Sequence, residues 1–428
     1  MLVVTSNWWV SDGTLSAPPL RRLVARFRAE VRRSSLRCGV GHDGRYRPVE
    51  AIDVVLAGDT FDWLVSREWT GDIRPWHGGG RAAAARERVA AATVRRGRRL
   101  SATLAAWMRH GVPVPVADRR GRPAATSRPV PVRVAVLSGD RDRWLEQAAC
   151  GRRGAASMAA VGTRWSDGEV TVQHGAAIDP LHAVDEQQPT LGESLAVDLI
   201  AAFGVALHDD ARFRPLAAAL VRCVAGGCFV DAASRLAAWL AARDRGATLA
   251  ADARQDLIDA WHRAVDRWHR SARRLPCRRG EGIDLVGHVA DWLQLRHAPA
   301  DGAAWQSPGW FPGTPAEIDS GDAATVVLGH PPAGGWPSAA NRRKVVCLGL
   351  GPGPAPEVFA DVSADDLAGP AAVVVRPGRT GCLLDWLPIG GAAGGWANGD
   401  DDRIGRGGTR GVWLSDPARH GHGIVDAA

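Results

Sequence analysis

Five clusters of aspartate, histidine and glycine recur along the chain, each directly after a short apolar run. The clusters read SDGT at 11–14, GDTFD at 58–62, SGDRD at 138–142, QHGAAIDP at 173–180 and GHPP at 329–332. They supply carboxylate oxygens and imidazole nitrogens but no thiolate, which is the donor set of a hard or borderline divalent cation. A single cluster of this kind is commonly a turn or a structural histidine. Five in succession indicate a metal site.

The elements that must position these clusters are short buried strands. Val, Ile and Leu dominate the segments 2–10, 52–57, 132–137, 170–173 and 325–328, and each is followed within two residues by Gly or Ser. Predicted helices lie between them, which favours an α/β sheet. Ligands of such sheets gather at the carboxyl ends of the strands, where all five clusters fall.

Apolar residues at helical spacing predict the intervening helices. The predicted ranges are 20–33, 81–111, 190–207, 211–224, 231–245 and 251–275. In the last of these, Trp261 and Trp268 fall on one face, which we interpret as packing on the sheet domain. The alternative is a lid whose apolar face covers a substrate. Pro/Gly-rich composition predicts loops at 112–131 and 299–322.

The composition is that of a globular protein with a basic bias. The chain has 428 residues, of which 46% are hydrophobic and 23% charged, enough for a sizeable core. The net charge is +7, and every basic side chain except Lys344 is arginine, which we interpret as codon bias. A nucleic-acid partner is less favoured, because no basic platform with interleaved aromatic residues is evident.

Cysteine usage and the N-terminus bear on the compartment. The 7 cysteines are scattered without a CxxC pair, which argues against a disulfide scaffold or a structural zinc site. Neither a signal peptide nor an apolar run long enough to span a bilayer is evident. We therefore expect a cytoplasmic protein without a transmembrane segment, with peripheral attachment to a membrane as the alternative.

The ordered motifs resemble the calcineurin-like metallophosphoesterase family, whose pattern is D-x-H, GDxxD, GNHD or GNRD, a GH or HG element, and GHTH. The resemblance covers roughly residues 1–335 and is nearest to the branch that includes UDP-2,3-diacylglucosamine hydrolases. It rests on GDTFDWL, on Arg141 within SGDRD, on HGxxxDP, and on a helical insertion before the last motif. It implies an α/β fold with a metallophosphoesterase-type β-sandwich flanked by helices.

The same resemblance divides the chain. The metallophosphoesterase domain would comprise residues 1–180 and 299–383, separated by a helical insertion, or lid, at 181–298. The residues after it, 384–428, are dominated by Gly, Ala, Asp and Arg, and we expect a loosely ordered tail there.

Residue by residue, the resemblance implies four ligands of a second metal: Asp59, Asp140, His174 and His330. Asp59 matches the aspartate that bridges the two metals. Asp140 stands where the family has asparagine, and its added negative charge would favour a dication. Arg141 is expected to contact a substrate phosphate, because a guanidinium forks onto phosphate oxygens. The implied cofactor is a divalent metal, with Mn²⁺ preferred over Fe²⁺ or Zn²⁺.

The first-metal set implied by the resemblance is incomplete. Asp12 matches its aspartate, but Thr14 and Pro332 replace the two histidines that serve only this metal, and Ala176 replaces a histidine near the substrate. The sequence therefore favours one ion over two. Asp12 could instead cap the following turn. Two further aspartates of the motifs are expected to orient loops rather than bind metal: Asp62 and Asp142.

Two functions are compatible with this pattern. The first is a metallophosphoesterase that hydrolyses a phosphomonoester, phosphodiester or pyrophosphate, acting on a phosphorylated small molecule or a lipid-linked substrate. The alternative is a catalytically inactive protein of the same fold that binds a phosphorylated ligand or a protein partner. The four surviving ligands favour the hydrolase, whereas the replacements at Thr14 and Pro332 favour the inactive protein.

Overall fold

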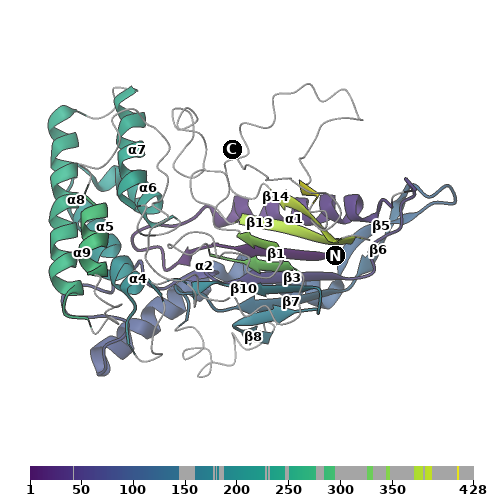
Figure 1. The fold of residues 1–428 in the computed structure, drawn as a ribbon, viewed down its shortest axis with the longest axis horizontal. Helices are drawn as coiled ribbons and strands as arrows, with labels where there is room; N and C mark the ends of the chain where they lie inside the picture. Colours follow the sequence, from purple (N-terminus) through teal and green to yellow (C-terminus); the bar gives the residue numbers. More distant parts are fainter. Residues whose placement is uncertain are drawn as a thin grey trace.

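The protein has a mixed α/β fold that contains several separate sheets. Its structure, a computed structural model, describes these residues: 1–41, 43–143, 160–176, 179, 181–182, 188–226, 229, 232–245, 250–275, 284–294, 325–330, 344–347, 371–378, 381–387 and 412–413. Figure 1 shows the sheets in the middle of the molecule and the helices of residues 191–292 gathered at one end. The α/β class expected from the sequence is confirmed.

The larger sheet is built on three parallel strands. β3 (Ile52–Ala57) lies between β1 (Leu2–Ser6) and β7 (Val132–Leu137). Further strands extend the sheet at its edges: β8 (Ala160–Gly162) beside β7, and β13 (Ala371–Gly378), β14 (Gly381–Leu387) and β15 (Val412–Trp413) beyond β1. Because β1, β3 and β7 are parallel, their carboxyl ends meet at one edge of the sheet.

A second sheet packs on the first through apolar side chains. Its order is β12 (Lys344–Cys347), β11 (Thr325–Leu328), β10 (Val170–Gln173) and β9 (Arg164–Ser166). In it, β10, β11 and β12 are parallel. Leu2, Val4 and Val55 of the first sheet share one buried cluster with Val172 and Val327 of the second.

Helices cover the other side chains of the first sheet. Successive strand residues point to opposite faces, so Val3 and Val54 leave the cluster between the sheets. They join a core that includes Phe27 of α1 (Leu20–Gly39) and Val89 of α2 (Gly80–His110). The buried residues of α2 recur at helical spacing, as the sequence pattern predicts.

Residues 191–292 form a helical part. Its elements are α4 (Leu191–Ser194), a π-helical segment (Leu195–Ala201), α5 (Ala202–Asp209), α6 (Arg214–Ala225), α7 (Ala232–Arg245), α8 (Ala251–Ala272) and α9 (Leu285–Trp292). α8 packs on α4, the π-helical segment, α5 and α9. Trp261 of α8 lies edge-on against Phe203 of α5, with the ring centroids 5.1 Å apart. Its Nε1 donates to the carbonyl oxygen of Leu293.

The tryptophans of α8 therefore differ from expectation. Trp261 and Trp268 are both fully buried, as the core interpretation requires. Trp261, however, packs among helices rather than on the sheets, because α5 and α9 flank α8 within the helical part. A face buried to this extent does not lie open to a substrate.

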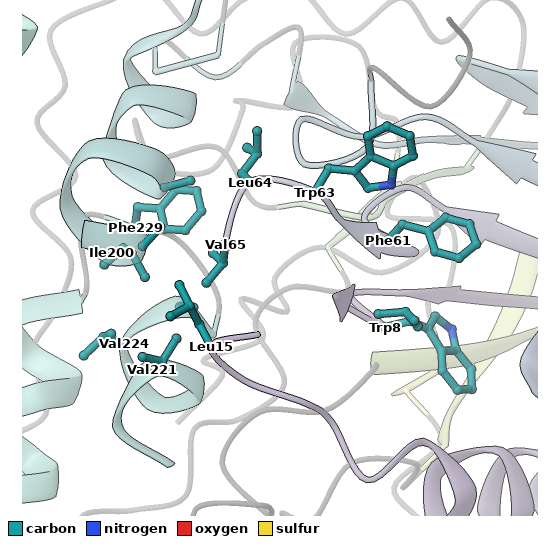
Figure 2. Packing of buried hydrophobic residues seen from close by; sticks show 14 of the residues in the cluster. Trp8, Leu15, Phe61, Trp63, Leu64, Val65, Ile200, Val221, Val224 and Phe229 are labelled. Atoms are coloured by element: carbon teal, nitrogen blue, oxygen red, sulfur yellow. The ribbon is translucent and has the colours of Figure 1, made fainter. Parts of the chain in front are cut away.

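The helical part contacts the loops that follow two short strands, β2 (Val10–Ser11) and β4 (Phe61–Asp62). Figure 2 shows Leu15 and Val65 from these loops among Val221 and Val224 of α6, all members of one buried cluster. Ion pairs add to the contact: Arg74 with Asp198 at 2.5 Å, and Arg143 with Glu193 at 2.6 Å. The helices thus hold the loops at the carboxyl ends of the strands.

The first apolar run is not one strand. The chain turns at Asn7 and Trp9, whose φ angles are 61° and 44°, and then pairs Val10 of β2 with Phe61 of β4. This turn buries Trp8 against Phe27, with ring centroids 5.3 Å apart, which a continuous strand would not do.

The predicted loop at 112–131 is instead a hairpin of β5 (Val112–Ala117) and β6 (Pro123–Val130). Val112 and Val114 are buried, so a period-two pattern of valines outweighs the intervening prolines. Among the described residues this sheet comprises two strands, so both are edge strands, where proline is tolerated. The loop predicted at 299–322 lies outside the described residues. The tail predicted at 384–428 is described only at the end of β14 and at β15.

One helical stretch among the described residues, Leu191–Asp209, is long and apolar enough to cross a membrane. Most of it is buried against the rest of the chain, as in the core helix of a globular protein. The described residues therefore support no transmembrane segment.

We expect Trp261→Ala to destabilise the helical part by about 3–5 kcal/mol, because it removes a fully buried indole and its hydrogen bond. Denaturant unfolding followed by circular dichroism measures the change. Arg267→Ala, at an exposed position of α8, is the matched control and is expected to stay within about 0.5 kcal/mol. Equal unfolding midpoints for the two variants would contradict the core assignment of Trp261.

Candidate metal centre

The carboxyl ends of both sheets meet at one place. The Ser6 hydroxyl, at the end of β1, donates to the carbonyl oxygen of Gly329, at the end of β11. The His330 amide donates to the carbonyl oxygen of His174, so the ends of β10 and β11 stay paired beyond the strands. Residues separated by more than 300 positions in the chain are thereby brought together.

This convergence requires two glycines. A Cβ atom at Gly58 would lie 2.2 Å from Cδ2 of His174, and one at Gly139 would lie 2.3 Å from Oδ1 of Asp59. Gly58 also has a φ of 85°, a region that other residues rarely adopt. Asp59 itself has a φ of 52°, a strained value of the kind that concentrates at functional sites.

The four predicted second-metal ligands form one group. Asp59, Asp140, His174 and His330 each offer a donor atom, and these atoms all lie within 4.8 Å of one another. His174 Nε2 lies 3.4 Å from Asp59 Oδ1 and 3.5 Å from Asp140 Oδ1. All four side chains are buried. Carboxylates and imidazoles at this spacing could hold a divalent cation.

The hydrogen bonding of the group supports this assignment. Both carboxylate oxygens of Asp140 and both ring nitrogens of His174 are buried without a hydrogen-bond partner. Leaving a buried polar atom unpaired costs about 1–3 kcal/mol, and more for a charged group. A cation could remove this cost, because it accepts lone pairs from the carboxylate of Asp140 and the imidazole of His174.

A second group of donors adjoins the first and was not assigned from the sequence. Asp179, His182 and His330 offer donor atoms within 4.8 Å of one another, and all three are buried. His182 Nε2 lies 3.4 Å from Asp140 Oδ2, and His330 Nε2 hydrogen-bonds Asp179 Oδ2 at 3.2 Å. The DP of HGxxxDP contained Asp179, whereas nothing in the motifs singled out His182.

Buried negative charge exceeds buried positive charge here. The network contains five buried aspartates: Asp59, Asp62, Asp140, Asp142 and Asp179. The one buried arginine among the described residues is Arg141, so five carboxylates and one guanidinium carry a formal charge of −4. Buried charges of one sign strongly disfavour one another, so cations or protons must compensate them.

Without a metal, protons supply part of this compensation. Burial acts to lower the pKa of His174, but the charges of Asp59, Asp140 and Asp142 outweigh it and raise the pKa to about 9. Burial and the charge of Asp59 raise the pKa of Asp142 to about 7. For Asp59, burial acts to raise the pKa, but His174 and Arg141 hold it below its ordinary value.

Arg141 is deeply buried, and its guanidinium contacts other groups of the chain. Its Nη1 donates to Asp62 at 3.1 Å, its Nη2 donates to the carbonyl oxygen of Ala225 at 2.6 Å, and its Nε lies 3.6 Å from Asp59. The guanidinium carbon lies 5.0 Å from the ring centroid of Trp9 and 4.3 Å from that of Phe229. It therefore ties the end of α6 to the Asp59 loop. The phosphate contact expected from the sequence stays a prediction.

The expectation for Asp62 and Asp142 is confirmed, because both orient loops. Asp62 Oδ1 accepts hydrogen bonds from the amides of Leu64 and Val65. Asp142 accepts from the amide of Gly139 at 2.6 Å and from that of Phe61 at 3.2 Å. These contacts fix the turns that carry Asp59 and Asp140.

Asp12 is not brought into the donor groups found among the described residues. Its Oδ1 accepts from the Thr14 amide at 2.9 Å and the Thr14 hydroxyl at 2.8 Å, and its Oδ2 accepts from the Ser66 hydroxyl at 2.5 Å. Asp12 thus closes a turn, the role that the sequence left open beside metal binding. Pro332 lies outside the described residues.

Comparison with known proteins adds no assignment: no family model, curated protein or solved structure matches the chain.

We expect Gly139→Ala to weaken Mn²⁺ binding by at least about tenfold, because the new methyl group displaces Asp59 and His174. Isothermal titration of the full chain with Mn²⁺ measures the affinity. Gly80→Ala is the control, since a Cβ atom there meets nothing within 4 Å. Unchanged affinity in the folded Gly139 variant would argue against this group as the binding site.

We also expect Mn²⁺ affinity to increase with pH. His174 must be neutral to bind a metal, and its pKa of about 9 means that binding at neutral pH releases its proton. Each pH unit below 9 should therefore lower the affinity at least about tenfold, because the pKa of His330 is raised as well, and the dependence should level off above 9. Titrations in buffers of different ionisation enthalpy count the released protons. Release of no proton at pH 7 would contradict the prediction.

Proposed function

We propose that the protein is a metal-dependent phosphoesterase-like hydrolase that cleaves a phosphomonoester, a phosphodiester or a pyrophosphate. The proposal rests on the buried convergence of Asp59, Asp140, His174 and His330, in which Asp140 and His174 have no hydrogen-bond partner. Two carboxylates and two imidazoles suit Mn²⁺, with Fe²⁺ and Zn²⁺ as alternatives. The packing of two sheets face to face supports a metallophosphoesterase-type β-sandwich.

The proposed chemistry divides between the cation and the chain. A bound divalent cation would supply neutralisation of phosphoryl charge and activation of water for attack on phosphorus. Asp59, Asp140, His174 and His330 hold it at the edge where both sheets end. Asp179 hydrogen-bonds His330, and a carboxylate in this position fixes the orientation of a ligating ring. The proposed substrate is a phosphorylated small molecule or a lipid-linked phosphate ester.

The alternative is a catalytically inactive protein that binds a phosphorylated ligand or a partner, and one observation favours it. Thr14 and Ser66 donate three hydrogen bonds to Asp12, so its carboxylate is already satisfied within the chain. An enzyme that needs Asp12 for a metal would have to break these contacts.

Turnover of p-nitrophenyl phosphate, bis-p-nitrophenyl phosphate and pyrophosphate by the full chain with Mn²⁺ distinguishes the two. We expect Asp59→Asn to lower kcat/KM at least about a hundredfold, since a metal contributes several kcal/mol to the transition state. Asp53→Asn is the matched control: Asp53 lies on β3, the strand that precedes Asp59, and pairs with an exposed arginine, Arg133. We expect it to retain activity.

The outcomes separate the hypotheses. Folded protein that binds Mn²⁺ but turns over none of the three compounds would support the inactive alternative. Equal activity in Asp59→Asn and wild type would remove the proposed centre from the reaction.

A further inference from the structure

We infer that the chain binds a second divalent cation at Asp140, Asp179 and His182, beside the first ion and bridged to it by Asp140. This inference rests on the proposed function, because it takes Asp59, Asp140, His174 and His330 as the first site. It does not involve Asp12, because Thr14 and Ser66 already satisfy that carboxylate within the chain.

The carboxylate of Asp140 has the geometry of a bridge. Its Oδ1 lies 3.5 Å from His174 Nε2, in the first donor group. Its Oδ2 lies 3.4 Å from His182 Nε2, in the second. Neither oxygen accepts a hydrogen bond, although the side chain is buried. A carboxylate that faces an imidazole with each of its two oxygens can ligate one cation through each, as in two-metal centres with ions about 3.5–4 Å apart.

Packing, rather than a hydrogen bond to Nδ1, positions the ring of His182. Only 7% of the residue is exposed, and its Nδ1 is buried and unpaired. The ring lies against the first turn of α4, where a Cβ atom at Gly192 would come 1.9 Å from its Cε1. The amide of Gly192 donates to the carbonyl oxygen of Leu181, which fixes the backbone next to His182. The imidazole is thus held by packing, with its Nε2 3.4 Å from Oδ2 of Asp140.

Asp179 completes the second set. The residue is fully buried, and its Oδ1 accepts from the amide of Leu181 while its Oδ2 bonds His330. These contacts fix the carboxylate within 4.8 Å of donor atoms of His182 and His330. The His330 ring contacts both other histidines, with centroid distances of 5.3 Å to His174 and 5.5 Å to His182. The two donor groups are therefore contiguous.

Charge balance favours two cations over one. The buried network has a formal charge of −4 when its five aspartates are ionised and Arg141 is counted. One dication leaves half of this charge uncompensated in a buried region, whereas two compensate it fully. Among the described residues, no arginine or lysine other than Arg141 is buried in this network.

The test is the stoichiometry of Mn²⁺ bound to the full chain after removal of metal by a chelator, with paramagnetic resonance spectra of the loaded protein. We expect two ions in wild type, with a spectrum of exchange-coupled Mn²⁺. His182→Gln should bind one ion, with the spectrum of isolated Mn²⁺ and with the tighter affinity changed less than about threefold. His262→Gln on α8, outside both donor groups, is the control and should bind two.

A second variant tests the same site independently, in case His182→Gln does not fold. Gly192→Ala leaves His182 in the chain but drives its ring from the site, and it should also reduce the stoichiometry to one. Wild type that binds a single ion, or His182→Gln and Gly192→Ala that retain two coupled ions, would overturn the second site and leave the proposed function standing. Wild type that binds no Mn²⁺ would overturn both.

Discussion

The concentration of buried carboxylates where the two sheets end is the constraint on which the rest of this structure depends. Moving an ionised carboxylate out of water costs several kcal/mol even after the protein relaxes. Each aspartate meets this cost differently. Backbone amides satisfy Asp62 and Asp142, and Arg141 adds its charge beside Asp59 and Asp62. Asp140 alone receives no hydrogen bond to either oxygen and faces the imidazoles of His174 and His182, so its carboxylate could bind a cation.

Close approach of the backbone, rather than long side chains, brings these buried carboxylates together. The strand ends approach so closely that Gly58 and Gly139 leave no room for a Cβ atom, and Asp59 takes a positive φ. Such strain persists only where the surroundings determine the backbone. The helical part provides those surroundings: α6 accepts a hydrogen bond from Arg141, and α4 binds Arg143 through Glu193. The helices therefore contribute to the centre without supplying its ligands.

Local sequence patterns predict one part of the centre: the strands and the aspartates and histidines that directly follow them. β3, β7, β10 and β11 were predicted at their observed bounds, because a short apolar run that ends at a polar cluster has a distinct signature. The aspartates and histidines directly after those strands could be named for the same reason. The break of the first run at Asn7 and Trp9 could not, because it depends on what Trp8 packs against.

His182 shows why the other half of the centre was missed. It follows no strand, and its position depends on the first turn of α4 and on the small size of Gly192. Neither contact has a signature in the sequence near His182. Asp179 is part of a recognisable motif, but its partner His330 lies 151 residues away along the chain. Only the folded chain places these residues beside Asp140.

Asp12 and Asp140, two aspartates of the motifs, differ in how many hydrogen bonds the chain supplies to the carboxylate. Asp12 and Asp140 both follow apolar strands and are both buried. Asp12 receives three hydrogen bonds from Thr14 and Ser66, and a cation would have to displace them. Asp140 receives none and faces an imidazole with each oxygen. Thr14 and Ser66 thus satisfy Asp12 within the chain, whereas Asp140 faces His182, which shares a second donor group with Asp179 and His330.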